Sequence, residues 1–135
     1  MLDLYDYVTI HGKNDIADWR ASLQKPDRAK LDQKLERLQQ VSYDLAVHTH
    51  LLAGPVFEHV YKLRVNASVM LRPHLCRGPI TNEKEYTLLV GAIEIGDRLP
   101  HGIQEMAASR RRDVLLDPRR RRMVHGLQGV MRHVN

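Results

Sequence analysis

Basic side chains alternate with apolar ones along residues 60–78, VYKLRVNASVMLRPHLCRG. Because successive side chains of an extended chain point to opposite faces, this alternation predicts two antiparallel strands joined by a tight turn at Asn66-Ala67. The basic side chains that would then share one face are Lys62, Arg64, Arg72 and His74. Such a face could gather cations around a phosphate and stabilise the charge that builds up during phosphoryl transfer, or it could be a solvated surface without chemistry. A register shift of one residue would scatter the four side chains.

The segments around these two strands alternate between strand and helix periodicity, and they indicate the fold class. The predicted elements are a strand over residues 6–11, helices over 14–23 and 26–40, an irregular segment over 41–56, the two strands above, a strand over 86–95 and a helix over about 101–112. The two early helices are separated by a short break at Lys25-Pro26, which predicts a helical hairpin. This order predicts an α+β fold, with a small antiparallel-rich sheet that has the helices on one side.

The positive charge of the chain lies at its C-terminal end. The net charge is +5, but residues 110–135 contain eight arginines and two aspartates, so residues 1–109 sum to −1. We therefore predict a domain over residues 1–112 and a basic extension over 113–135. The extension contains apolar residues at helical spacing: Met123, Leu127, Val130, Met131 and Val134. A basic tail commonly contacts nucleic acid or an acidic protein, here through Arg119, Arg120, Arg121 and Arg122, and the alternative is a solvated charge run.

Length and composition exclude several classes of protein. A chain of 135 residues with 43% hydrophobic residues suits one globular domain. No apolar run approaches the roughly 20 residues that cross a bilayer, so no membrane partner is expected. The acidic N-terminus does not match a secretory signal peptide. Cys76 is the single cysteine, so no internal disulfide can form, which fits a reducing cytoplasm.

Histidine and cysteine side chains raise the questions of metal binding and of thiol catalysis. His48 and His50 form an HxH pair, with His59 and Cys76 as companions, but no second closely spaced pair completes a zinc pattern. Cys76 lies two residues from His74, yet nothing nearby would activate a thiolate. We expect no metal and no cofactor.

Three segments resemble the RelE/ParE toxin superfamily, and within it the HigB and phage-derived RelE-like proteins. Residues 16–40, IADWRASLQKPDRAKLDQKLERLQQ, are similar to its helical hairpin. Residues 58–65, EHVYKLRV, resemble its Leu-Arg strand, and residues 86–100, YTLLVGAIEIGDRLP, resemble the strand that ends in a turn and a proline before a helix. Together the similar segments lie within residues 5–112, and residues 113–135 lie outside the resemblance.

The resemblance implies a small toxin that a cognate antitoxin neutralises. RelE and HigB proteins cut mRNA without a metal, often on the ribosome, whereas ParE proteins act on gyrase and lack the nuclease residues. On this basis we expect catalytic roles for Arg64, Arg72, His74 and Arg98, and RNA contacts from Lys62, Arg77, His101, Arg110 and Arg111. The protein would then be the toxin component of a type II toxin–antitoxin system, with mRNA and the ribosome as partners.

One departure from the family pattern keeps a second function open. Where relatives commonly have lysines after the strand, this chain has Glu94 and Asp97, and carboxylates beside a phosphate oppose its binding. The alternative is therefore a non-catalytic RelE/ParE-like protein that binds a protein target, such as a gyrase-directed toxin or a phage-derived inhibitor.

Overall fold

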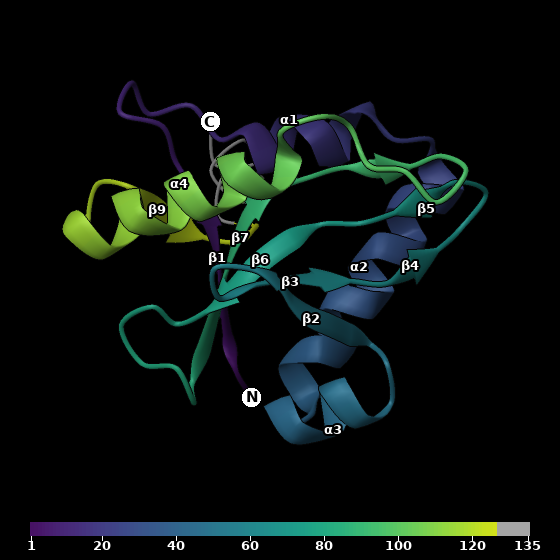
Figure 1. Ribbon diagram of the computed structural model, residues 1–135, viewed down its shortest axis with the longest axis horizontal. Helices are drawn as coiled ribbons and strands as arrows, with labels where there is room; N and C mark the ends of the chain where they lie inside the picture. Colours follow the sequence, from purple (N-terminus) through teal and green to yellow (C-terminus); the bar gives the residue numbers. More distant parts are fainter. Residues whose placement is uncertain (127–135) are drawn as a thin grey trace.

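The computed structural model describes residues 1–126, which contain four helices and nine strands (Figure 1). The helices are α1 (Asp15–Ser22), α2 (Lys25–Gln40), α3 (Tyr43–His48) and α4 (Ile103–Leu116). The strands are β1 (Asp3–Tyr7), β2 (Leu52–Phe57), β3 (Val60–Leu63), β4 (Val65–Asn66), β5 (Met70–Leu71), β6 (His74–Arg77), β7 (Glu85–Val90), β8 (Ile93–Glu94) and β9 (Arg122–Val124). The α+β class predicted from the sequence is confirmed. No helix in this range is long and apolar enough to cross a bilayer.

The strands form a six-stranded sheet and a small three-stranded one. The order of strands in the six-stranded sheet is β2-β3-β6-β7-β1-β9. The pair β1 and β7 is parallel, and all other neighbouring strands of this sheet are antiparallel. The second has the order β4-β5-β8. Because β4 follows β3 and β5 precedes β6, the small sheet continues the central hairpin beyond the main sheet (Figure 1).

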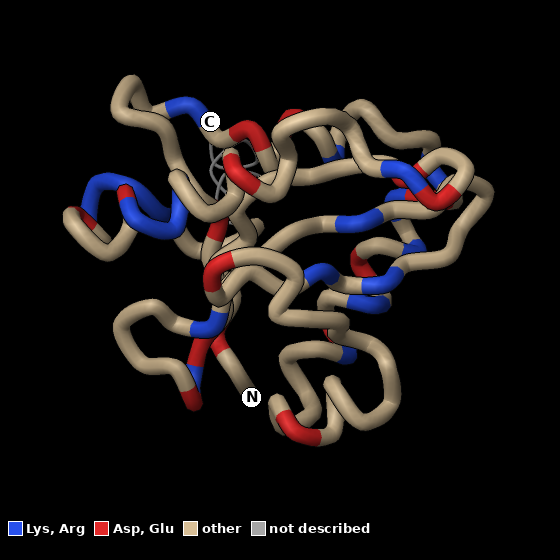
Figure 2. The backbone as a smooth tube through the Cα atoms, in the orientation of Figure 1, with Lys and Arg blue, Asp and Glu red and all other residues tan. Residues whose placement is uncertain are grey.

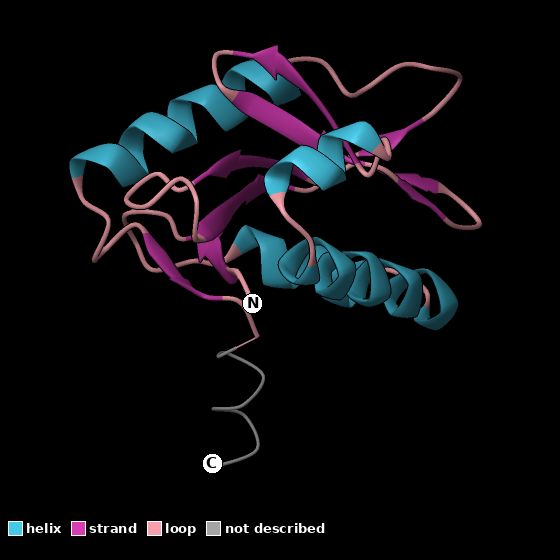
Figure 3. Ribbon diagram, turned by 90° about the horizontal axis from the view of Figure 1, so that it is seen from below, coloured by secondary structure: helices cyan, strands magenta, loops and turns pink. Residues whose placement is uncertain are grey.

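Helices cover both faces of the main sheet, so the prediction that they share one side is wrong. The leucines of α2 (Leu31, Leu35, Leu38) pack with Leu63 and Leu88 of the sheet. On the opposite face, Ala107, Ala108 and Val114 of α4 pack with Val60, Cys76 and Leu89. Figure 3 shows α2 and α4 on opposite sides of the strands. Strands that are apolar on both faces, as β7 is, require such cover on each side.

Two N-terminal predictions also differ from the structure. The first strand ends at Tyr7 rather than His11, because residues 9–13 form a turn in which the Thr9 amide donates to the Lys13 carbonyl at 2.9 Å. The segment 41–56, predicted to be irregular, forms α3 and most of β2. Ser42 caps α3 by accepting a hydrogen bond from the Leu45 amide at 3.1 Å, a signal the sequence does contain.

The predicted strand over residues 86–95 is interrupted after Val90. A Cβ on Gly91 would lie 2.0 Å from a ring carbon of Trp19, so glycine lets the α1 indole pack directly against the backbone. The chain then bends and resumes as β8, which pairs with β5 and sets Glu94 opposite Met70. The bend thus brings an acidic residue onto the basic hairpin.

Part of the predicted C-terminal extension joins the sheet, as strand β9. The predicted boundary after residue 112 falls within α4, and β9 pairs antiparallel with β1 through Tyr5, Asp6 and Tyr7. Met123, predicted to lie on a helix, therefore lies in a strand. The other apolar positions of that predicted helix lie outside the described residues.

Candidate functional site

The register of the central hairpin brings the four predicted basic residues onto one face. Lys62 lies opposite His74, and Val65 lies opposite Leu71, so the same register sets Arg64 opposite Arg72. The loop is Ala67–Val69 rather than a two-residue turn at Asn66-Ala67. Both the amide and the hydroxyl of Ser68 in this loop donate to the buried carboxylate of Asp27 on α2, at 2.9 and 2.7 Å. This long-range anchor helps to hold the register that the alternation predicts.

Glu94 lies among these cations, and its one carboxylate pairs with two of them. Its Oε1 is 3.6 Å from Lys62 Nζ, and its Oε2 is 3.5 Å from Arg72 Nη2. The exposed fractions of the side chains are 20% for Lys62, 8% for Arg72 and 16% for Glu94, so the ion pairs are largely removed from water. We call Lys62, Arg72, His74 and Glu94 the sheet cluster. In the sheet cluster, both cations are therefore paired with a carboxylate of the protein itself.

The remaining bonds of the sheet cluster hold Arg72 and His74 in place. Arg72 donates to the Leu71 carbonyl at 2.8 Å and to Asn66 Oδ1 at 3.1 Å. His74 is fully buried, and its Nδ1 donates to the Arg72 carbonyl at 2.8 Å. Its Nε2 has no partner among the described residues. Burial lowers the pKa of His74, and the nearby Lys62 charge acts in the same direction. The imidazole is therefore neutral at pH 7 and cannot reach a substrate in this conformation.

The hollow next to the sheet cluster is acidic. It measures about 390 Å³ at the start of α4 and is lined by Lys62 and by three carboxylates, those of Glu94, Asp97 and Glu105. The predicted site residues Arg98 and His101 are exposed and do not line it. A hollow with this charge balance suits a cation or a neutral group better than a phosphate.

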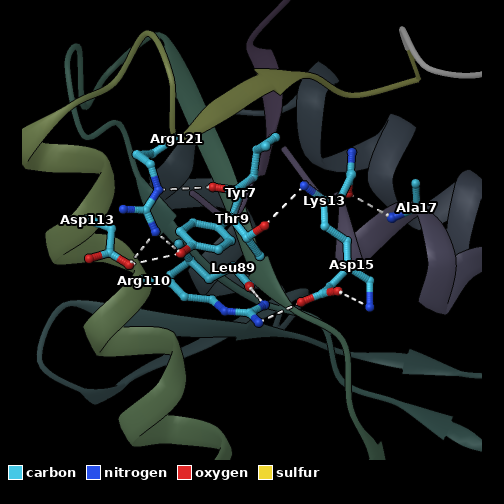
Figure 4. A network of polar contacts seen from close by, with 11 residues as sticks. Tyr7, Thr9, Lys13, Asp15, Ala17, Leu89, Arg110, Asp113 and Arg121 are labelled. Carbon is cyan, nitrogen blue, oxygen red and sulfur yellow. Dashed lines mark hydrogen bonds and ion pairs between the residues drawn. The ribbon is translucent and has the colours of Figure 1, made fainter. Parts of the chain in front are cut away.

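The other predicted RNA contacts are distributed over different parts of the molecule. Arg77 lies on the opposite face of the sheet, where its guanidinium stacks 3.8 Å from the centre of the Tyr43 ring. Arg110 donates to the Leu89 carbonyl at 2.9 Å and to Asp15 at 2.7 Å, which ties α4 to β7 and α1 (Figure 4). Arg111 is half-buried on α4, and its Nε has no partner among the described residues. These three arginines do not converge with the sheet cluster.

The arginine run divides into inward and outward members. Arg121 donates to Asp113 at 2.9 Å and to the Tyr7 hydroxyl, which joins the end of α4 to β1 (Figure 4). Arg122 forms an ion pair with Glu85 and stacks 3.9 Å from the centre of the Tyr5 ring. Arg119 and Arg120 are exposed. Half of the predicted contact with an acidic partner is therefore used to attach β9 to the domain.

In the part of the chain that the structure describes, the thiol and the histidines show no arrangement for catalysis or metal binding. Cys76 is buried in β6, and burial raises its pKa to about 12, which disfavours the reactive thiolate. Within residues 1–126, no group of three His, Cys, Asp or Glu side chains lies close enough to hold a metal ion.

A second basic region lies where the sheet meets α2, and of its residues only Arg64 was predicted to be a site residue. This hollow of about 530 Å³ is lined by Lys34, Arg37, Thr49, His50, Leu51, Arg64 and Asn66. We call it the basic hollow. Figure 2 shows lysine and arginine segments of α2 and of the neighbouring strands in the same region. Lys34 and Arg37 are three residues apart on α2, a spacing that places them on one helix face, and this was the available signal.

No family model, curated protein or solved structure matches this chain. The functional argument therefore depends on the residues and their geometry.

Proposed function

We propose that this chain is a non-catalytic RelE/ParE-like interaction protein, which acts in the cytoplasm by binding a macromolecular target. The observation that carries the proposal is the position of Glu94, whose carboxylate contacts both Lys62 and Arg72. A phosphate at this face would compete with a carboxylate that the fold already holds there. The buried, neutral His74 adds no accessible acid or base to the site.

A second candidate is the endoribonuclease of a type II toxin–antitoxin system. The hairpin register favours it, because Lys62, Arg64, Arg72 and His74 lie on one face as metal-free RNA cleavage would require. On this hypothesis the chain binds mRNA on the ribosome and is neutralised by a cognate antitoxin. Displacement of Glu94 would have to accompany activity.

Mapping of mRNA ends in a reconstituted translation reaction tests the proposal. We expect no cleavage by the wild-type protein, because Lys62 and Arg72 are paired with Glu94 within the fold and His74 is buried. Cleavage that disappears in the Arg64→Ala/Arg72→Ala/His74→Ala variant would overturn the proposal and favour the nuclease. Expression toxicity that the neighbouring gene relieves would indicate a toxin of either kind, so end mapping is the measurement that separates the two.

The Glu94→Gln variant in the same reaction tests whether the Glu94 carboxylate prevents the sheet cluster from binding or cleaving mRNA. If the carboxylate alone blocks phosphate, this variant gains cleavage or mRNA binding that the wild type lacks. The matched control is Glu105→Gln, because Glu105 lines the same hollow and forms no ion pair with another described residue. An equal gain in both variants would mean that net charge, and not the contact with Lys62 and Arg72, controls binding.

A further inference from the structure

The basic hollow contains cations whose charge is not compensated by neighbouring residues. Its lining includes Lys34, Arg37 and Arg64 and no Asp or Glu residue. None of the three forms an ion pair with another residue in the range 1–126. Like charges repel when they are held close together, so an external anion would relieve this repulsion.

Separate elements of the fold hold the lining residues in position. Lys34 and Arg37 extend from α2, whose leucines are anchored in the core. Arg64 lies between β3 and β4, where its amide donates to the Leu51 carbonyl at 3.0 Å. His50 follows α3 in a left-handed conformation with φ of 62°, which is uncommon for a residue with a side chain. The hollow is thus built by three segments that are distant in sequence and fixed by packing.

We propose that the basic hollow binds the phosphodiester backbone of a nucleic acid. Its charged side chains are donors, and Asn66 also offers its amide N–H₂ because Asn66 Oδ1 already accepts from Arg72. Phosphate oxygens are pure acceptors and suit such a lining. The volume of about 530 Å³ lies within the range of ligand-sized pockets.

The apolar content of the hollow distinguishes this ligand from an acidic protein. Leu51 is the one aliphatic residue of the lining, which contains no Phe, Tyr or Trp; its one aromatic ring is the imidazole of His50. Protein interfaces generally need an apolar centre with aromatic or arginine anchors. Recognition of unpaired bases needs aromatic stacking platforms. A lining of cations with one aliphatic residue and one imidazole therefore suits the phosphate backbone better than an apolar protein anchor or a row of stacked bases.

This inference goes beyond the proposed function, because it names a ligand class at a surface separate from the sheet cluster. Binding at the basic hollow is independent of whether the sheet cluster cleaves RNA. Different observations would therefore contradict the two proposals. Cut mRNA ends would contradict the non-catalytic function, and equal affinity losses in the test and control variants would contradict nucleic-acid binding at the basic hollow.

Fluorescence anisotropy with the full chain tests the inference. The probes are a labelled 20-nucleotide unstructured RNA, the DNA of the same sequence and its duplex, with polyglutamate as competitor. We expect Arg37→Ala/Arg64→Ala to weaken RNA binding by tenfold or more at 50 mM salt. The matched control is Arg119→Ala/Arg120→Ala, which removes the same charge from an exposed segment, and we expect its affinity to stay within threefold of wild type. Circular dichroism melts confirm that both variants are folded.

Each outcome of this experiment bears on the proposal. A preference for one probe identifies the kind of nucleic acid and supports the proposal. Equal losses in the two double variants would overturn it, because binding would then follow net charge alone. Competition by polyglutamate at the same charge concentration as RNA would also overturn it, in favour of an acidic protein. No detectable binding of any probe would overturn it outright.

Discussion

Two basic regions of this protein meet at Asn66 and differ in how their charges are compensated. In the sheet cluster, Lys62 and Arg72 are largely buried and share the carboxylate of Glu94. In the basic hollow, Lys34, Arg37 and Arg64 face an open space that no carboxylate lines. Asn66 belongs to both regions, since it accepts from Arg72 and lines the hollow. The two cations of the sheet cluster share one carboxylate in a largely buried site, whereas the three cations of the basic hollow have none beside them.

Burial accounts for this difference. A charge that a strand carries beneath a packed helix loses its hydration, so it persists only with a partner nearby. A charge on an exposed helix face or turn keeps its water and needs no partner. The strand positions that looked most like an active site in the sequence are therefore those most in need of internal compensation.

The largest expected effect extends this comparison to the arginine run. Arg122→Ala removes the partner of Glu85, and the two side chains are only 10% and 9% exposed. Leaving that carboxylate buried and unpaired should lower the free energy of unfolding by about 3–5 kcal/mol. Arg119→Ala is the control, because Arg119 is exposed, and it should change stability by less than about 0.5 kcal/mol. Urea unfolding of both variants measures the difference, and equal values would mean that the β9 ion pair contributes nothing specific.

The next effect concerns the compensation of the sheet cluster. Glu94→Gln leaves Lys62 and Arg72 without their carboxylate, and we expect a loss of about 1–3 kcal/mol in the free energy of unfolding. Glu105→Gln removes the same charge from an exposed helical position and should be nearly neutral. A Glu94→Gln variant as stable as the Glu105→Gln variant would show that the two ion pairs are already screened by water, and the contrast between the two regions would weaken.

The elements predicted correctly from the sequence are those whose pattern depends only on residues close together in the chain. Leu31, Leu35 and Leu38 define the buried face of α2 by spacing alone, and all three are in the core. The alternation in residues 60–75 predicts the shared face of Lys62 and His74, which the strand register confirms. Both patterns follow from the geometry of a single helix or strand and depend on no distant residue.

Contacts between distant segments were not predictable in this way. The arginines of residues 119–122 look alike in sequence, yet two point inward only because Asp113 and Glu85 lie beside β9. Glu94 was recognised as acidic, but its position between two cations depends on the bend at Gly91 and on the pairing of β8 with β5. The same limit applies to the basic hollow, whose α2 and β3–β4 residues become neighbours only after folding.

A smaller effect tests the protonation state of His74. Burial lowers its pKa in the folded state below the ordinary value of about 6.5, so the unfolded chain binds the proton first as the pH falls. Stability is therefore complete above pH 6.5 and decreases on acidification, with a slope of up to about 1.4 kcal/mol per pH unit from this group. His74→Asn keeps a side-chain N–H for the Arg72 carbonyl and removes the titration.

The measurement is the difference in unfolding free energy between wild type and variant from pH 7.5 to pH 5. This difference should shrink as the pH falls, because only the wild type loses the histidine contribution. If the free energies of unfolding of the wild type and of His74→Asn change equally with pH, burial does not hold the imidazole neutral. His74 could then act as an acid or base, as the nuclease hypothesis requires.

The smallest effect on stability separates Arg64 from Lys62, two residues apart on the same face of the central hairpin. Arg64→Ala should change the unfolding free energy by less than about 0.5 kcal/mol, because the side chain is exposed. If Arg64 contacts one phosphate, this variant should reduce the slope of log affinity against log salt by about one for the RNA probe. Lys62→Ala removes the same charge, but Lys62 is paired with Glu94 within the fold, so we expect the salt slope to remain that of the wild type. Equal changes in the two variants would mean that the pairing of a cation within the fold does not decide whether it is available to a ligand.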